Sequence, residues 1–332
     1  LDIEGGGTAV VRTEPIGPLV GVMPWNYPYY QVARFAAPNI ALGNTIILKH
    51  ARNCPQSALA IERLFLEAGL PSGVYRNAFI SSAQVAATIA DQRIQGVSLT
   101  GSEKAGSAVG EVAGRHLKKC VLELGGSDPF IVLGDADVDA AAKAGAVGRL
   151  GNGGQACTAS KRFLVEDRVY DEFIDKFTAA MSTWHPSDPT DNATKLGPMA
   201  SQAGVDELDE LVRDALAHGA KALLGGTPSN SAGAFYPPTI LTGVTREMRA
   251  FDEELFGPVA VVHRVHSIDE AIDVANDSPF GLASSVFTSD PEQAQRVARD
   301  LETGMVWINS TSKTAPDLPF GGVKGSGFGR EL

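Results

Sequence analysis

One cysteine of this sequence has surroundings that suit a nucleophile. Cys157 stands in the stretch GNGGQACTASKRF, where three glycines precede it and an apolar run that favours a strand follows it. Small neighbours leave a thiol accessible, and a thiolate attacks electrophilic centres such as carbonyl carbons. A cysteine is also often a small buried hydrophobe, so a packing role for Cys157 stays open on local evidence.

The other two cysteines have different surroundings. Cys54 opens a helical pattern before a proline, and Cys120 lies in the apolar run KKCVLEL. Three cysteines at irregular spacing give no disulfide framework, and no paired Cys/His spacing indicates zinc. We therefore expect no metal site and a single cysteine, Cys157, with catalytic surroundings.

Two more polar side chains lie where apolar runs end. Glu123 closes the run before Gly125 in LELGG, and a carboxylate in such a place must be solvated, paired or functional. Asn26 stands between the prolines of PWNYP, so rigid backbone holds its amide. An ordinary turn asparagine is the alternative for Asn26.

The elements that must position these residues follow from an alternation of short apolar runs and helical patterns. The runs are LVGVMP, NTIILKH, VYRNAFIS, GVSLTG and KKCVLEL. Five strands joined by helices predict a parallel, doubly wound, Rossmann-like sheet, the usual platform for a nucleotide. The fold class is therefore α/β.

A second α/β domain follows the motif GGSDPF. It begins with the run FIVL, continues with helices around 138–150 and 169–183, and ends near GMVWINS. Before the first strand, TAVVRTEPIGP looks like a β-arm for oligomerisation. We expect a β-arm over 1–19, a dinucleotide-binding domain over 20–125, a catalytic domain over 126–319 and a C-terminal return segment over 320–332.

The nucleotide signal is distributed, because no Gly-x-Gly-x-x-Gly motif follows the first strand. In SLTGSEKAG a strand runs through Gly101 and Ser102 into a helix, whose free N–H groups favour a phosphate. Ser102 as an ordinary helix cap is the alternative. Lys49 and Arg52 follow another strand at the edge where such sheets bind ligands, although a solvated charge pair would look the same.

Composition excludes several classes of protein. The 332 residues include 28 Lys and Arg and 39 Asp and Glu, which gives a net charge of −11. This charge disfavours nucleic acid as a partner. No apolar run approaches the roughly 20 residues that span a membrane. The first residues lack the pattern of a secretory signal, so we expect a cytoplasmic protein without a membrane partner.

Eight motifs stand in the order and near the spacing of one family. They are PWNYP, TGS, LELGG, GQACTASKRF, EELFGPV, NDSPFGLASSVF, GMVWIN and PFGGVKGSGFGRE. Over almost its whole length the chain resembles the aldehyde dehydrogenase superfamily. LKHA and LELGGSDPFIVL look most like the shorter bacterial succinate-semialdehyde dehydrogenases. Relative to that family we expect about a hundred N-terminal residues and the terminal strand to be missing.

The resemblance implies a covalent mechanism. Cys157 attacks the aldehyde carbon, while the Asn26 amide and the Cys157 N–H hold the oxyanion. Hydride then leaves for a nicotinamide. Glu123 activates the water that hydrolyses the thioester.

The resemblance also implies the cofactor contacts. Glu254 and Phe256 match positions at the nicotinamide ribose and ring, and Ser102 and Lys49 match phosphate and ribose contacts. The full predicted set is Pro24, Trp25, Lys49, Arg52, Gly101, Ser102, Glu254 and Phe256. Relatives that prefer NAD usually carry a glutamate where Arg52 stands, so we expect NADP as the preferred cofactor and NAD as the second.

A substrate prediction starts from Arg34, which follows Asn26 by eight residues, about two helical turns. The resemblance implies that Arg34 pairs with the carboxylate of a short semialdehyde, with Tyr30, Ala156 and Thr314 at the other pocket positions. A surface or interdomain salt bridge is the alternative for Arg34. We expect succinic or glutaric semialdehyde as substrate and a homodimer or homotetramer.

Three other functions stay open. A family fragment or structural relative would bind cofactor without turnover. A cysteine hydrolase needs a histidine beside the thiol, and none of the six histidines shares a motif with Cys157. A CoA-acylating dehydrogenase typically lacks the glutamate that Glu123 matches.

Overall fold

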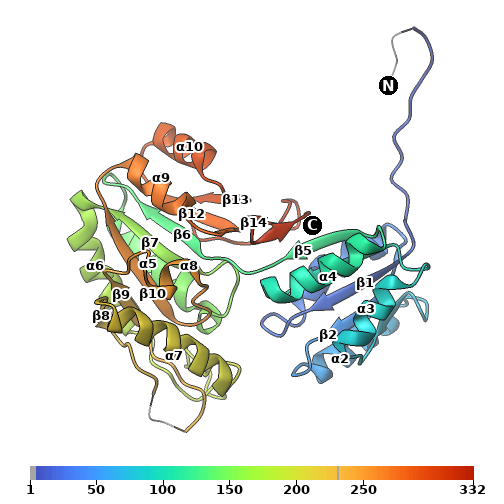
Figure 1. Ribbon diagram of the computed structural model, residues 1–332, viewed down its shortest axis with the longest axis horizontal. Helices are drawn as coiled ribbons and strands as arrows, with labels where there is room; N and C mark the ends of the chain where they lie inside the picture. The colour runs from blue at the N-terminus through green and yellow to red at the C-terminus, as the bar shows by residue number, and fades with distance from the viewer. Residues whose placement is uncertain (1–4, 230–231) are drawn as a thin grey trace. The chain divides into compact units, whose positions relative to one another are not determined.

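The computed structural model describes residues 5–229 and 232–332 (Figure 1). It divides the chain into two compact units. Unit 1 runs to Leu122 and includes Glu331 and Leu332, and unit 2 spans Glu123–Arg330. Glu123 thus belongs to unit 2, whereas the sequence-based division placed it at the end of the first domain.

The strands of unit 1 are neighbours in the order β5-β4-β1-β2-β3. Its strands are β1 (Pro18–Met23), β2 (Thr45–His50), β3 (Tyr75–Asn77), β4 (Gly96–Thr100) and β5 (Lys119–Glu123). Strand β1 pairs in parallel with both β2 and β4, and β2 pairs in parallel with β3. The chain leaves β1 in one direction and returns to its other side at β4, which is the crossover where such sheets bind ligands.

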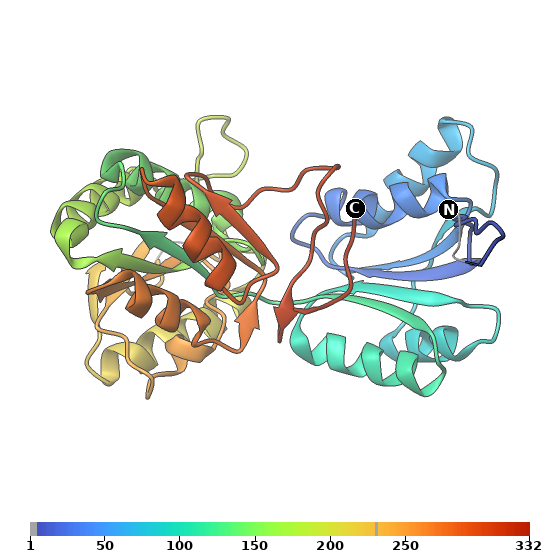
Figure 2. The same cartoon turned by 90° about the horizontal axis from the view of Figure 1, so that it is seen from above.

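Four helices cover the two faces of this sheet. They are α1 (Tyr30–Ala41), α2 (Pro55–Glu67), α3 (Ser82–Ala90) and α4 (Glu103–Arg115). Figure 2 shows α1 and α2 on one face and α3 and α4 on the other. Local signals set their starts: Ser81 and Gln84 form a reciprocal capping box at α3, and the Ser102 hydroxyl caps α4.

The segment before β1 is extended. Residues 5–16 are almost all exposed, with one isolated bridge at Thr8. Its junction with the sheet is held by Asn44, whose Oδ1 accepts hydrogen bonds from the backbone N–H groups of Ile16 and Gly17 at 2.7 and 3.0 Å. Residues 1–4 of the predicted arm lie outside the described residues, and pairing of the arm with a second chain stays a prediction.

Unit 2 contains a seven-stranded sheet in the order β13-β12-β6-β7-β10-β9-β8. Its strands are β6 (Asp128–Val132), β7 (Ser160–Glu166), β8 (Lys221–Leu224), β9 (Thr239–Thr242), β10 (Val259–Val265), β12 (Ala283–Phe287) and β13 (Met305–Ile308). All its pairs are parallel except β8 with β9. The short strands are β11 (Phe280–Gly281), β14 (Val323–Lys324) and β15 (Gly327–Phe328).

Helices cover both faces of this sheet, which explains why its central strands are apolar throughout. They are α5 (Val138–Leu150), α6 (Asp167–Ser182), α7 (Gln202–Ala217), α8 (Arg249–Asp252), α9 (Ile268–Asn276) and α10 (Pro291–Asp300). Because successive strand residues point to opposite faces, Phe130 packs with α5 and α6 while Ile131 packs with α9 and α10.

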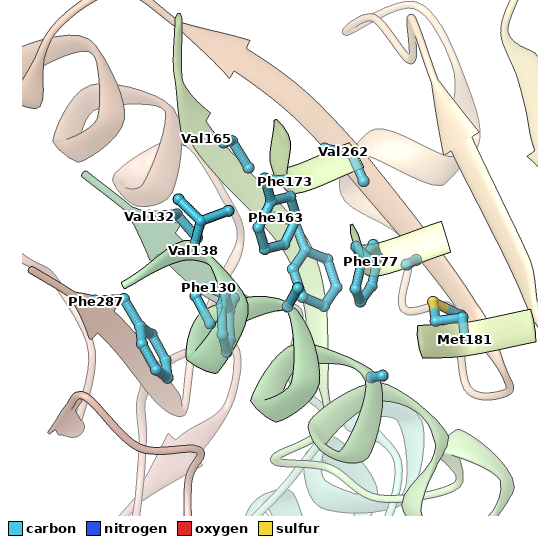
Figure 3. Close-up of a cluster of buried hydrophobic side chains, with 14 of the residues drawn as sticks. Phe130, Val132, Val138, Phe163, Val165, Phe173, Phe177, Met181, Val262 and Phe287 are labelled. Carbon is cyan, nitrogen blue, oxygen red and sulfur yellow. The ribbon is translucent and has the colours of Figure 1, made fainter. Parts of the chain in front are cut away.

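An aromatic cluster joins β6 and β7 to the helix that leads to Cys157. Figure 3 shows Phe130, Phe163 and Phe177 in this core, and the rings of Phe163 and Phe177 have centroids 4.5 Å apart. Gly145 of α5 lies so close that a Cβ there would approach Phe163 to 2.8 Å. This contact packs the middle of α5 against the cluster, and the chain continues from the C-terminal end of the same helix toward Cys157.

Candidate active site

A glycine turn carries the chain from α5 to Cys157. Asn152, Gly153 and Gly154 all have positive φ, at 53°, 63° and 72°. A Cβ on Gly154 would collide with the backbone of Gly257 and lie 2.6 Å from Nη2 of Arg149, so only glycine fits there. The turn therefore packs directly against the segment that ends at Gly257.

The backbone around Cys157 forms a second, closed turn. Residues 151–159, which include both turns, make up the Cys157 turn. The N–H of Ala159 donates to the carbonyl of Ala156 at 3.1 Å, and the Cys157 side chain stays partly exposed. Gln155, directly before, accepts a hydrogen bond from the N–H of Ala200 at 2.9 Å through its side-chain oxygen. The nucleophile thus stands on backbone that is held on both sides.

Two buried cations hold the carbonyl groups of this segment. Nη2 of Arg149 donates to the carbonyl of Gly154 at 2.6 Å. Nζ of Lys161 donates to the carbonyls of Ala156 and Cys157 at 3.0 and 2.9 Å. Sequence reasoning missed both cations, although a lysine at the start of the strand expected after Cys157 was a usable signal.

Glu123 lies in the segment beside this turn. Its side chain is 1% exposed, and Gly126, three residues later, is so close to Cys157 that a Cβ there would meet the Cys157 carbonyl at 2.7 Å. A Cβ on Gly321 would likewise approach Oε1 of Glu123 to 2.6 Å. Unit 2 therefore brings the predicted nucleophile and base into adjacent segments.

Glu254 lies close to the same turn. Its Oε1 is 2.9 Å from Nζ of Lys161, while Lys161 is 1% exposed. Phe256 follows at a half-buried position, and Gly257 packs against the turn at Gly154. The predicted ribose contact and the predicted nucleophile thus share one ammonium group.

The remaining predicted cofactor residues lie at one edge of the unit 1 sheet. Val22 of β1 is level with Lys49 on one side and with Leu99 on the other, so three strands end at the same height. The residues that follow these strand ends are Pro24, Trp25, Asn26, Arg52, Gly101 and Ser102. Parallel strands put all of their carboxyl ends on the same edge, as the sequence predicted.

The donors at this edge suit an anionic ligand. Ser102 caps a helix of 13 residues, and the first backbone N–H groups of such a helix face its N-terminus with a positive partial charge. Lys49 is partly buried, and burial together with the Arg52 charge lowers its pKa. Cations and N–H donors of this kind fit the phosphates of a dinucleotide.

His50 anchors the turn that carries Asn26. Its Nδ1 accepts the N–H of Ala51 at 3.0 Å, so Nε2 holds the proton and donates to the carbonyl of Pro28 at 2.8 Å. Burial lowers the pKa of His50 and favours this neutral form. Sequence reasoning missed the role, although a histidine that ends an apolar strand was a signal.

Arg34 occupies a buried ion pair. Its Nε donates to Oε2 of Glu331 at 2.5 Å, and the other oxygen of Glu331 accepts from the Ser98 hydroxyl at 2.6 Å. Arg34 and Glu331 are only 3% and 6% exposed. The surface or interdomain salt bridge that the sequence left as the alternative therefore differs from the observed pair, which is buried within unit 1. A role of Arg34 at the substrate stays a prediction.

The other predicted substrate residues are dispersed in the two units. Tyr30 begins α1 in unit 1 and is 39% exposed. Ala156 is buried in the Cys157 turn, and Thr314 lines a cavity of about 260 Å³ beside Trp307 and Phe320. A role for these residues in substrate binding stays a prediction.

The three cysteines are free and differ in surroundings. Burial raises the pKa of Cys120 to about 11 and also raises that of Cys54, so both stay protonated at neutral pH. Among the described residues no group of three or more His, Cys, Asp or Glu side chains is placed to hold a metal ion. In the same part of the chain no helix has the length and apolarity to cross a membrane.

The comparison with known families gives a clear result. Residues 2–332 match the aldehyde dehydrogenase family. This chain is an aldehyde dehydrogenase family member. The match confirms the resemblance that the eight motifs indicated.

Two curated relatives of this aldehyde dehydrogenase share a name. This chain is 57% identical over 326 residues to a succinate-semialdehyde dehydrogenase [NADP(+)] of Deinococcus radiodurans, covering 98% of this chain and 68% of that protein. A protein of the same name from Mycobacterium avium is 47% identical, over 99% of this chain and 70% of the relative.

Solved structures agree with the fold of this aldehyde dehydrogenase. A succinic semialdehyde dehydrogenase from Streptococcus pyogenes, in complex with NADP+ as the cofactor, matches with a TM-score of 0.94 and 47% identity. The match covers 96% of this chain and 70% of that one. A succinate-semialdehyde dehydrogenase from Burkholderia pseudomallei has a TM-score of 0.93 and 40% identity, over 96% and 66% of the two chains. The predicted α/β fold class is therefore confirmed.

Proposed function

We propose that this chain oxidises succinate semialdehyde to succinate, with NADP⁺ as the preferred hydride acceptor and NAD⁺ as the second. The observation that carries the proposal is the Cys157 turn, an accessible thiol on fixed backbone in the segment beside the buried Glu123. The names of the relatives in D. radiodurans and M. avium support the choice of aldehyde and cofactor.

The residues of the chain divide the reaction between them. The Cys157 thiolate attacks the aldehyde carbon, and the Asn26 amide with the Cys157 N–H donates hydrogen bonds to the oxyanion. The nicotinamide cofactor supplies, when bound, the acceptor for the hydride that leaves this adduct. Glu123 then takes a proton from the water that hydrolyses the thioester, which releases the acid and the thiol.

The cofactor residues bind by complementary charge. Ser102 and the N-terminus of α4 hold phosphate, Lys49 reaches phosphate and ribose, and Glu254 and Phe256 hold the nicotinamide ribose and ring. Pro24, Trp25 and Gly101 supply backbone and apolar contact beside them. Arg52 meets a 2′-phosphate bidentately, and a guanidinium cannot accept the hydrogen bonds that ribose hydroxyls would donate.

A role of Arg34 in reading the substrate carboxylate is part of the proposal, with Tyr30, Ala156 and Thr314 at the other pocket positions. We also propose that the protein acts in the cytoplasm as a homodimer or homotetramer.

The test is cofactor reduction followed by absorbance, without CoA. Succinate semialdehyde, glutarate semialdehyde and butanal are compared with NADP⁺ and with NAD⁺. We expect the largest kcat/KM for succinate semialdehyde with NADP⁺. A preference for butanal would contradict the substrate, and activity only with CoA present would indicate an acylating enzyme.

The absence of any reduction needs a second measurement. Quenching of protein fluorescence by NADPH then distinguishes a chain that binds cofactor without turnover from one that binds none. Binding without turnover would contradict the proposed activity and favour the alternative of a non-catalytic relative.

A further inference from the structure

Lys161 is a buried charge with several hydrogen-bond partners near Cys157. It follows the nucleophile by four residues, at the start of β7, and its side chain is 1% exposed. Its ammonium lies 3.0, 2.9 and 3.4 Å from the carbonyl oxygens of Ala156, Cys157 and Ala159. An ammonium has three N–H groups, so these three carbonyls account for its hydrogen-bonding capacity.

The same ammonium is paired with a carboxylate from a distant part of the chain. Oε1 of Glu254 lies 2.9 Å from Nζ of Lys161. Since the three carbonyls take the N–H directions, the carboxylate is held mainly by charge. Lys161 is therefore a charged link between the Cys157 turn and the segment of Glu254, in addition to the contact of Gly154 with Gly257.

Other charged groups face this pair from neighbouring elements. Asp128 of β6 is buried, and burial raises its pKa to about 7 although the Lys161 charge opposes the rise. Arg149 at the end of α5 interacts with both Glu254 and Asp128, and burial lowers its pKa to about 10. Removing one member of such a buried set leaves an uncompensated charge, which is costly.

We propose that Lys161 is a positioning residue, which fixes the backbone of the Cys157 turn and couples it to Glu254. The roles of Cys157 as nucleophile and Glu254 as ribose contact rest on the proposed function. Three carbonyl oxygens that converge without a cation would repel one another, so the ammonium is what keeps the turn closed. The Cys157 N–H, which must face the oxyanion, belongs to this same turn.

The coupling has a consequence for the thiol. The ammonium is 2.9 Å from the carbonyl oxygen of Cys157, and a positive charge held against the residue that carries a thiol favours its thiolate form. Glu254 partly neutralises that ammonium, so it has the opposite effect. A side chain that only filled space would not give effects of opposite sign.

The experiment measures alkylation of Cys157 by iodoacetamide against pH, with peptide mass spectrometry to identify the site. Lys161→Met, which preserves length without charge, is expected to shift the profile to higher pH and to slow alkylation at pH 7 about tenfold, as one unit of thiol pKa would. Glu254→Gln is expected to shift the profile to lower pH. Lys143→Met, at an exposed lysine of α5, is the matched control and should match the wild type.

Kinetics supply a second measurement. Lys161→Met is expected to lower kcat and also to raise KM for NADP⁺, because the turn and Glu254 are disturbed together. Lys161→Arg should restore the alkylation profile but only part of kcat, since a planar guanidinium cannot meet the three carbonyls as an ammonium does. If Lys161→Met does not fold, Lys161→Arg and Glu254→Gln carry the test.

Several results would overturn the proposal. One is a folded Lys161→Met variant whose alkylation profile and KM for NADP⁺ both equal those of the wild type. The others are an unchanged alkylation profile in Glu254→Gln, and profile shifts of the same sign in both variants. If the wild type reduces no NADP⁺ with any aldehyde, the proposed function fails, but alkylation of Cys157 still tests Lys161.

Discussion

The Cys157 turn of unit 2 and the strand-end edge of unit 1 hold their functional groups in different ways. At the turn, the buried cations Arg149 and Lys161 fix backbone carbonyls. At the edge, Arg52 and Ser102 are exposed and Lys49 is only partly buried. A covalent nucleophile needs one geometry, and buried charges enforce it because little water screens them. The phosphates that we propose for the edge would meet solvent-exposed charges and backbone N–H groups, which tolerate exchange.

The largest effect is expected at the nucleophile itself. Cys157→Ser should lower aldehyde oxidation by at least about a thousandfold, because a serine hydroxyl is not ionised at neutral pH. NADPH binding, followed by fluorescence, should change little. Cys120→Ser is the control, since its thiol stays protonated. Equal losses in both folded variants would place the nucleophile elsewhere.

Glu123→Gln tests the buried carboxylate in the segment beside the Cys157 turn. We expect a burst of NADPH near one equivalent per site, followed by steady turnover lowered about 10²–10⁴-fold, because hydrolysis loses its general base. Rapid-mixing absorbance measures both phases. Unchanged steady turnover would exclude the role, and loss of the burst as well would indicate that Glu123 activates the thiol.

The buried ion pair of unit 1 predicts a large effect on stability. Glu331→Ala and Arg34→Ala should each lower the free energy of unfolding by about 3–5 kcal/mol, because the remaining charge is buried without its partner. Urea denaturation measures the loss.

Substrate kinetics on the same variants separate the two roles of Arg34. If Arg34 also reads the substrate carboxylate, only Arg34→Ala raises KM for succinate semialdehyde far more than KM for butanal. Equal changes of KM for the two aldehydes would remove Arg34 from substrate recognition.

An exposed residue at the edge should give a smaller change. Arg52→Glu is expected to move the ratio of kcat/KM for NADP⁺ over NAD⁺ toward NAD⁺ by about ten- to a hundredfold, since one charged contact is exchanged. Turnover with saturating NAD⁺ should persist, because Arg52 does not belong to the Cys157 turn. A constant ratio would show that Arg52 does not contact the 2′-phosphate.

The smallest expected effect concerns acid stability in unit 2. Burial, and then the Arg162 charge, lower the pKa of His263 to about 4. Below the ordinary pKa near 6.5 the unfolded chain binds a proton that the folded chain does not, so stability falls as pH drops from about 6.5 toward 4. His263→Phe should recover about 2 kcal/mol at pH 5 relative to pH 7.5. Identical pH profiles of Tm for wild type and variant would contradict this.

The sequence alone determined the elements, and its local pattern proposed residues for the chemistry. Periodicity placed all five strands of unit 1, and the helix expected around 138–150 is α5. Small residues beside Cys157 and a carboxylate at the end of an apolar run selected Cys157 and Glu123. These signals act over a few residues, so a linear reading contains them.

Only the tertiary structure decided which buried charges are paired. Arg34 pairs with Glu331, which is 297 residues away in the sequence, and Lys161 pairs with Glu254 from the segment before β10. The same holds for Gly154, whose need for glycine depends on the backbone of Gly257. A buried charge has no local preference among distant partners, because the choice depends on which segments the packed sheets bring within a few ångströms of it.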